Sequence, residues 1–168
     1  MSTPLEIERK YVIRKPDISM LSSHEGYTVS QIDQTYLESA AHVTHRVRAR
    51  RYLGRTVYTE TRKVRIDKMS VYEDEREISE SEYMALIANR AIDTVTLRKT
   101  RHTFIYLGQT FEIDIYPEWR ETAILETELE SRETVVAFPD FIEIVAEVTG
   151  EKKYSNASMS REFPTELV

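Results

Sequence analysis

Alternating apolar and polar residues predict a series of short β-strands along most of the chain. In residues 5–13, with the sequence LEIERKYVI, the two-residue repeat of a strand places Glu6 and Glu8 on one face and the neighbouring Ile7 on the other. The same analysis indicates strands at residues 27–38, 43–52, 55–66, 70–78, 93–107, 109–116 and 123–130. Gly54 and Gly108 each separate two of these strands, so we expect a hairpin turn at both positions.

A different period predicts a small number of helices. Ser79 and Glu82 have the spacing of a capping box, and the apolar residues after them recur at helical intervals, which predicts a helix over residues 80–91. Shorter helices are expected at residues 18–26, at residues 132–138 and after a cap at Asn156, whereas residues 141–148 fit either a helix or a strand. This order of elements predicts one antiparallel α+β domain spanning residues 1–168.

The polar face of each predicted strand is dominated by one sign of charge. Acidic pairs share a face at Glu6/Glu8, Glu73/Glu75, Glu112/Asp114 and Glu126/Glu128, and basic residues do so at Arg46/Arg48/Arg50 and Lys99/Arg101, with Lys63 beside Thr61. A single strand of this kind is typical of a solvated edge, but surface strands usually mix signs because neighbouring like charges repel. The repetition therefore favours converging charged walls that hold a polyanion together with divalent cations. Such strands can close into a barrel around a small ligand; an open sheet is the alternative.

Composition and net charge exclude several classes of protein. The 168 residues contain no Cys, so the chain has no disulfide and no thiolate metal site or nucleophile. The net charge of −6 argues against binding to nucleic acid, and the basic residues gathered between residues 46 and 68 fit a small anionic ligand instead. No apolar run is long enough to span a membrane and no signal peptide is recognisable, so we expect a cytoplasmic protein.

Taken in order, these motifs resemble the CYTH family, also called triphosphate tunnel metalloenzymes. The resemblance rests on Glu6-Ile7-Glu8-Arg9-Lys10, Gln34-Thr35-Tyr36-Leu37, Arg46-Val47-Arg48, Thr61-Arg62-Lys63, Glu73-Asp74-Glu75, Lys99-Thr100-Arg101, Glu112-Ile113-Asp114, Glu126-Thr127-Glu128 and residues 147–156. It implies a closed eight-stranded antiparallel β-barrel with flanking helices, and it is strongest for short bacterial members that hydrolyse inorganic tripolyphosphate. One departure is Val71, where the family often has an Arg; Arg65 or Lys68 could supply that charge.

The resemblance and the charge pattern together assign candidate site residues. The expected metal ligands, for Mg²⁺ or Mn²⁺, are Glu6, Glu8, Glu126 and Glu128, followed by Glu73, Glu75 and Asp114. The expected phosphate-binding residues are Lys10, Arg46, Arg48, Lys63, Lys99 and Arg101, with Lys152 at one end of the tunnel. Tyr36 and Lys63 match a proposed catalytic base pair of thiamine triphosphatase relatives. Arg50, Arg65 and Arg98 are expected to face outward or to lie near the rim.

Three functions remain compatible with these residues. A metal-dependent inorganic triphosphatase is the leading hypothesis. A class IV-type adenylyl cyclase, or a thiamine or nucleoside triphosphatase, would keep the fold, although cyclisation needs a nucleoside pocket that no motif reveals. A polyphosphate-binding module without turnover is the third. The expected partner is a small-molecule triphosphate, and the sequence leaves open whether the chain forms a homodimer.

Overall fold

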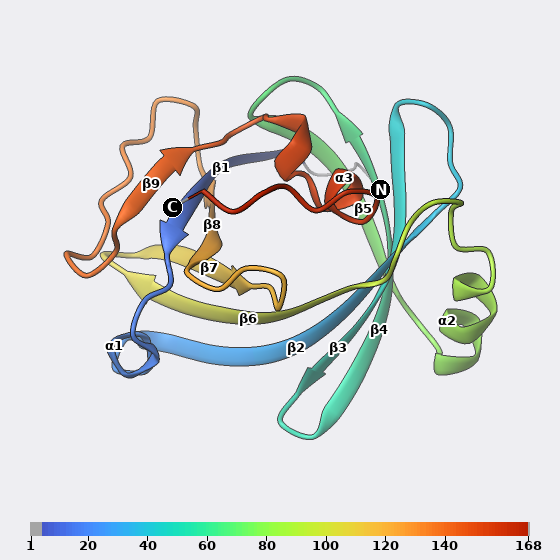
Figure 1. The fold of residues 1–168 in the computed structure, drawn as a ribbon, viewed down its shortest axis with the longest axis horizontal. Coiled ribbons are helices and arrows are strands. Elements are labelled where there is room, and N and C mark those ends of the chain that lie inside the picture. The colour runs from blue at the N-terminus through green and yellow to red at the C-terminus, as the bar shows by residue number, and fades with distance from the viewer. Residues whose placement is uncertain (1–4, 168) are drawn as a thin grey trace.

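A computed structural model describes residues 5–167 and shows eight antiparallel strands closed into a barrel. The strands are β1 (Leu5–Arg14), β2 (Glu25–Leu37), β3 (Val43–Tyr52), β4 (Arg55–Arg65), β5 (Ser70–Ile78), β6 (Leu97–Tyr106), β7 (Gln109–Ile115), β8 (Thr122–Leu129) and the short β9 (Ile144–Glu147). The helices are α1 (Ile18–Ser22), α2 (Glu80–Ile87), the 3₁₀ helix η1 (Lys152–Tyr154) and α3 (Asn156–Met159). In Figure 1 the strands curve around a common interior.

Strand β1 closes the barrel. The sheet runs in the order β5-β4-β3-β2-β6-β7-β8-β1, and the first residues of β1 pair back onto β5, with Leu5 opposite Tyr72. Farther along the same edge, β9 replaces β5 as the partner, with Tyr11 opposite Glu147. Between the two, the amide of Val148 donates to the carbonyl of Lys10 at 2.8 Å. The edge of β1 is therefore paired along most of its length, and the expected closed eight-stranded barrel is confirmed.

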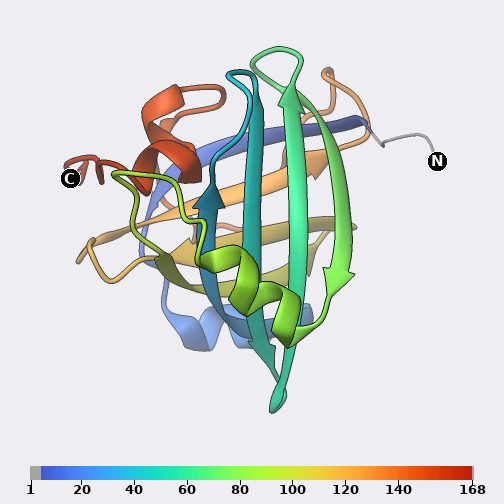
Figure 2. The same ribbon diagram turned by 90° about the vertical axis from the view of Figure 1, so that its right-hand side faces the viewer.

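The outer face of the barrel is apolar where it is covered. On β1, β6, β7 and β8, alternate residues such as Tyr11, Phe104 and Leu125 form one buried cluster. On the other side, α2 packs its Tyr83 against Val47 and its neighbours on β2, β3 and β5. Figure 2 shows α2 lying across β3 and β4. Burial of these outward positions leaves the opposite face of each strand for the interior.

One end of the interior is apolar as well. Val12, Leu97 and Ile124 continue the inward-facing rows of β1, β6 and β8 and are fully buried. They pack with Tyr154 and Met159 from the C-terminal segment, residues 148–167, which crosses in front of the barrel in Figure 1. The C-terminal segment therefore fills that end with side chains and confines the charged interior to the remainder of the barrel.

Most predicted elements are present, and the differences occur where packing overrides local pattern. Residues 132–138 form no helix, because Phe138 instead packs edge-on against Tyr11. The helix expected over residues 80–91 ends at Ile87, since the amide of Ala91 donates to the carbonyl of Tyr36 at 2.9 Å. α1 ends at Ser22, not at residue 26, and is followed directly by β2.

Three further boundaries also differ from expectation. The strand expected at residues 93–107 begins at Leu97, because Asp93 has a positive φ and Thr94 closes a turn. The ambiguous residues 141–148 contain a strand at Ile144–Glu147, and the last helix is capped by Ser155. No helix within residues 5–167 has the length and hydropathy needed to cross a membrane.

Gly150 lies in close contact with Lys68 in the β4–β5 turn. We therefore expect Gly150→Ala to destabilise the fold more than Gly54→Ala. Both glycines have left-handed backbones, with φ of +73° and +74°, so each substitution should cost about 1–2 kcal/mol. At Gly150 the new Cβ would also lie 2.8 Å from Cβ and 2.9 Å from Cα of Lys68, whereas at Gly54 it meets no atom within 4 Å. Urea denaturation of both variants measures the difference; equal losses would contradict the tight approach to Lys68.

Candidate functional site

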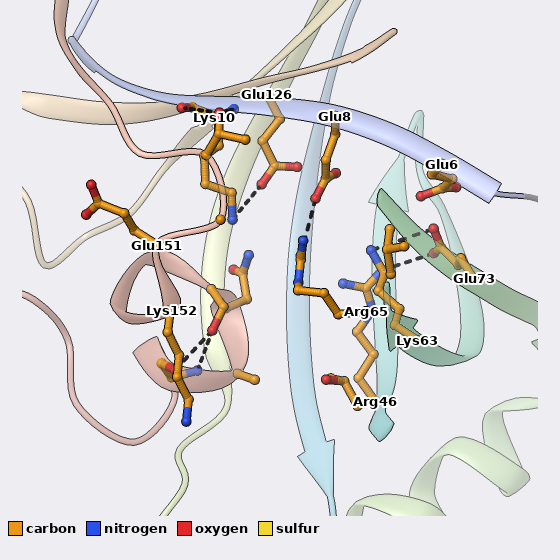
Figure 3. Close-up of a pocket in the computed structure, with 18 of the residues that line it drawn as sticks. Glu6, Glu8, Lys10, Arg46, Lys63, Arg65, Glu73, Glu126, Glu151 and Lys152 are labelled. Carbon is orange, nitrogen blue, oxygen red and sulfur yellow. Dashed lines mark hydrogen bonds and ion pairs between the residues drawn. The ribbon is translucent and has the colours of Figure 1, made fainter. Parts of the chain in front are cut away.

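A charged cavity of about 1080 Å³ occupies the barrel interior. The nine residues expected to point inward all line it: Glu6, Glu8, Lys10, Arg46, Arg48, Lys99, Arg101, Glu126 and Glu128. Tyr36, Lys63, Glu73, Glu75 and Lys152 line it as well. Figure 3 shows Glu6, Glu8 and Lys10 projecting from β1 into the cavity, Glu6 toward Glu73, Glu8 toward Arg65 and Lys10 toward Glu126. The two-residue repeat therefore identified the inner face of every charged strand.

Carboxylates crowd one wall of the cavity. Strand register places Glu8 directly opposite Glu128, a like-charge pair that disfavours ionisation of both. Burial, together with Glu73 and Glu128, raises the pKa of Glu6 to about 8. Burial and the charge of Glu126 raise the pKa of Glu8, and burial with neighbouring carboxylates raises that of Glu128. This wall carries more negative charge than its own neighbours neutralise.

The carboxylate wall fits a divalent cation that is shared with a ligand. Within residues 5–167, no three acidic or histidine side chains are close enough to form a ready-made metal site. Mg²⁺ commonly binds through one or two carboxylates plus oxygens of a phosphate ligand, so a complete protein ligand set is not required. Oxygen donors on β1 and β8, with raised pKa values that a cation would lower, match that mode of binding.

Basic side chains form the facing wall, and several are held loosely by carboxylates. The Nζ atom of Lys63 and Nη2 of Arg46 each lie 3.6 Å from an oxygen of Glu73, and Nζ of Lys10 lies 3.2 Å from Oε1 of Glu126. These distances mark ion pairs without close hydrogen bonds, except at Lys10. A phosphoryl oxygen that enters the cavity could replace the Glu73 carboxylate as the partner of Lys63 and Arg46 at little cost in interaction energy.

Asp114 has an environment unlike that of Glu6, Glu8 and Glu128. It is 1% exposed, and its two oxygens accept from Nε and Nη2 of Arg101 at 2.7 and 2.8 Å and pair with Nζ of Lys99 at 2.8 Å. Burial raises its pKa, but the charges of Arg101 and Lys99 outweigh burial and hold the pKa well below its usual range. Asp114 therefore lies behind Arg101 and Lys99, two of the residues expected to bind phosphate, and fixes their positions.

The same burial affects Lys99. Its side chain is fully enclosed, and burial with the nearby charges of Arg101 and Arg48 lowers its pKa to about 7, in spite of Asp114. Its Nζ also donates to Oδ1 of Asn156, from α3, at 3.3 Å, and Tyr116 donates to the same oxygen at 2.7 Å. The C-terminal segment thus contacts the phosphate-binding residues directly.

Tyr36 and Lys63 both line the cavity, but no hydrogen bond joins them among the described residues. The Oη atom of Tyr36 accepts from Nε2 of Gln34 at 2.7 Å, and Lys63 is directed to Glu73. A relay of a proton from water through Tyr36 to Lys63 would need contact between the two. The arrangement favours separate roles in binding a ligand.

Arg65, at the rim of the cavity, lies next to Val71, the position where the family often has an Arg. Arg65 is paired directly across the β4–β5 ladder from Val71, and its Nη2 lies 3.8 Å from Oε1 of Glu8 (Figure 3). It is half-exposed and lines the cavity, a place near the rim that agrees with the expectation of an outward or rim position. Lys152, the residue expected at one end of the tunnel, is exposed at the margin of the cavity. The carboxylate of Glu75 accepts a hydrogen bond from the hydroxyl of Thr61 at 2.7 Å.

The uncharged polar residues Gln34, Asn156 and Tyr116 received no role in the site from the charge pattern or the resemblance. Gln34 has a sequence signal that could have found it, because it lies two residues before Tyr36 and therefore on the same inner face. Asn156 and Tyr116 have no such signal, since the contact between them depends on how the C-terminal segment folds over the barrel.

Comparison with known proteins identifies the fold. No family model matches the chain, and no curated protein matches its sequence. Among solved structures, the inorganic triphosphatase NE1496 superposes with a TM-score of 0.58 at 23% identity, over 98% of this chain and 99% of that one. PH1819 from Pyrococcus horikoshii OT3 gives 0.59 at 19% identity, over 76% of this chain and 80% of that one.

A plant protein has the same fold. The putative adenylyl cyclase HpAC1 from Hippeastrum, described as having a dominant triphosphatase activity, superposes with a TM-score of 0.50 at 16% identity, over 74% of this chain and 80% of that one. Similarity at this level of identity establishes fold and not activity. The chain has the triphosphate tunnel fold of CYTH proteins.

The environment of Asp114 predicts a large cost for its neutralisation. We expect Asp114→Asn to lower the free energy of unfolding by about 3–5 kcal/mol, because the buried charge of Arg101 then has only the partly exposed Glu112 as a partner and Lys99 loses its carboxylate partner. Glu112→Gln is the matched control: Glu112 also pairs with Arg101, but its side chain is 32% exposed, and its loss should cost about 1 kcal/mol or less. Urea denaturation compares the two, and similar losses would show that Asp114 is not the counterion of the buried pair.

Proposed function

We propose that the chain is a divalent-metal-dependent phosphohydrolase that cleaves inorganic tripolyphosphate to pyrophosphate and phosphate. The observation that carries the proposal is the division of one closed cavity into a basic wall and an acidic wall. Among the described residues that line the cavity, acidic side chains are as numerous as basic ones. A lone anion would be repelled by the carboxylates, and a lone cation by the basic residues, whereas a polyphosphate with its cations complements both.

Each group of residues has a distinct task in this proposal. Lys10, Arg46, Arg48, Lys63, Lys99 and Arg101 bind and orient the phosphoryl groups, with Asp114 behind Lys99 and Arg101 as their positioning residue. Glu6, Glu8, Glu126 and Glu128 are the proposed ligands of Mg²⁺ or Mn²⁺, with Glu73 and Glu75 adjacent and Lys152 at the margin. When bound, the cation supplies charge neutralisation and promotes ionisation of water. Tyr36 and Lys63 contact substrate in this scheme.

The reaction requires little covalent chemistry from the protein. A water oxygen attacks a terminal phosphorus, the bond from that phosphorus to the bridging oxygen breaks, and pyrophosphate leaves. Fixed positive charges around the transferring phosphoryl group stabilise the charge that spreads over its oxygens in the transition state. The basic wall is preorganised for this task, because Arg101 and Lys99 are held at 2.7–2.8 Å by Asp114 before a ligand arrives.

The cavity wall argues for an inorganic substrate over a nucleotide. Tyr36 and His42 are the aromatic side chains among its described residues, and they offer a nucleobase little surface on which to stack. Adenylyl cyclisation also needs a pocket that holds the ribose, and no sequence motif marks one. Binding without turnover is the remaining alternative. We keep the cytoplasm as the expected compartment and a small-molecule triphosphate as the expected partner.

A phosphate-release panel tests the substrate. With matched Mg²⁺ or Mn²⁺, tripolyphosphate should give the highest kcat/KM, and ATP, thiamine triphosphate and pyrophosphate should be poorer, because pyrophosphate spans fewer basic contacts and the organic groups add bulk without hydrogen bonds. EDTA should abolish release. A higher kcat/KM for ATP or thiamine triphosphate would overturn the substrate, and binding of tripolyphosphate without release would overturn the enzymatic function.

The carboxylate wall generates a separate prediction about metal. Glu8→Gln and Glu128→Gln should each lower the apparent affinity for Mg²⁺ by at least about 10-fold, since loss of even an outer partner of a bound metal costs about 10- to 100-fold. Turnover as a function of Mg²⁺ concentration measures the effect. Glu130→Gln is the control, because Glu130 is exposed outside the cavity and should leave the curve unchanged. Wild-type curves for both variants would contradict the assigned ligands.

A further inference from the structure

Gln34 connects the phosphate-binding residues to Tyr36. It is fully buried on the inner face of β2, and its Oε1 accepts from Nε and Nη2 of Arg48 at 3.2 and 2.9 Å. Its Nε2 donates to Oη of Tyr36 at 2.7 Å. The strand register brings these side chains together, because Gln34 lies opposite Arg48 and Tyr36 lies opposite Arg46 across the β2–β3 ladder.

These contacts leave the side-chain amide of Gln34 only one orientation. An arginine guanidinium has donors and no acceptor, so the group that faces Arg48 must be the amide oxygen. The amide nitrogen then faces Tyr36 as a donor, and the phenolic oxygen must accept from it. A phenol that accepts through its oxygen still carries one O–H donor. Within residues 5–167, the O–H of Tyr36 donates to no protein acceptor in the structure.

The surroundings of Tyr36 determine which kind of acceptor its O–H can find. The Tyr36 side chain lines the cavity on the basic wall, beside Arg46 in the strand register. The positive charge of Lys10 is close enough to interact with it electrostatically. A group that enters this region is favoured if it can accept a hydrogen bond and if it carries negative charge. A phosphoryl oxygen does both.

We infer that Tyr36 donates a hydrogen bond to a phosphoryl oxygen of the bound polyphosphate, and that Gln34 is the positioning residue that directs both this donor and Arg48. The inference rests on the proposed binding of a triphosphate and adds the direction of the hydrogen bond. It assigns Tyr36 the role of a hydrogen-bond donor to the substrate in place of a proton relay, because the structure joins Tyr36 to Gln34 and not to Lys63.

Binding of a non-hydrolysable triphosphate separates this inference from the proposed function. The probe is diimidotriphosphate, whose P–NH–P bridges resist hydrolysis, titrated with Mg²⁺ by calorimetry. Tyr36→Phe should lower the affinity about 10-fold, the usual worth of a hydrogen bond to a charged group. If the wild-type protein binds the probe and Tyr36→Phe binds equally well, the inference is overturned while the function stands. If the wild-type protein does not bind, the proposed function itself fails.

Substitution of Gln34 tests the positioning role. In Gln34→Glu the carboxylate can still accept from Arg48, but it also accepts the O–H of Tyr36 and turns that donor away from the ligand. Adding Tyr36→Phe to Gln34→Glu should therefore cost no further affinity. Gln34→Met is the matched control of similar length. It has no group that can direct or accept the Tyr36 O–H, so Tyr36→Phe should cost less than 10-fold in that background but more than in Gln34→Glu.

The comparison is made within each background, so the charge that Gln34→Glu introduces cancels. A residue that only supports the fold would give the same Tyr36→Phe loss in all three backgrounds, and that result would overturn the role of Gln34. Urea denaturation of each variant confirms that the protein measured is folded. Should Gln34→Glu fail to fold, the cycle with Gln34→Met and the single Tyr36→Phe variant still tests whether Tyr36 donates to the ligand.

Discussion

The pairing of Asp114 with Arg101 and Lys99 makes a charged barrel interior tolerable. Removing a cation from water costs several kcal/mol, and a closed barrel must offset that cost on every inward-facing strand. For Arg101 and Lys99 this desolvation cost is offset by contacts of 2.7–2.8 Å with the fully buried carboxylate of Asp114, which no ligand displaces. Toward the cavity the offset is provisional, since Lys63 and Arg46 lie 3.6 Å from Glu73. The interior thus has fixed pairs that hold its geometry and loose pairs that a ligand can exchange.

This division also explains why carboxylates serve two purposes in one cavity. Asp114 is enclosed by cations and stays ionised, whereas Glu6, Glu8 and Glu128 are surrounded by one another and resist ionisation. Identical chemical groups therefore differ in function because of their neighbours and not because of their type. Solved structures of the same fold include a protein described as a putative adenylyl cyclase and one described as an inorganic triphosphatase, so the site and not the fold must carry the argument about chemistry.

The inner face of the barrel could be predicted from sequence because strand parity is a local property. Once Glu6 and Glu8 are known to share a face, Lys10 must share it, and the same logic applied to every charged strand. Parity does not report what lies across a ladder. Arg65 has the parity of Lys63 and lies near the rim as expected, but parity could not reveal that it faces Val71 across the ladder or that Glu8 lies 3.8 Å from it. The role of Asp114 was missed for a related reason, since burial depends on packing from several strands.

Folding order follows from the pairing of β1. The first strand bonds to none of its neighbours in sequence: Ile7 faces Ser70 on β5 and Leu129 on β8, and Tyr11 faces Glu147 on β9. Loop closure over such separations is slow, because its entropy is lost before the contacts form. During synthesis, Glu8 and Lys10 of β1 therefore lack their partners on β8 until more than two-thirds of the chain has emerged, so their charges stay in water while the β2–β4 hairpins assemble. A strand that was apolar on both faces in that position would be an aggregation hazard over the same interval; the charged row that faces the cavity in the folded protein reduces that hazard in the nascent chain.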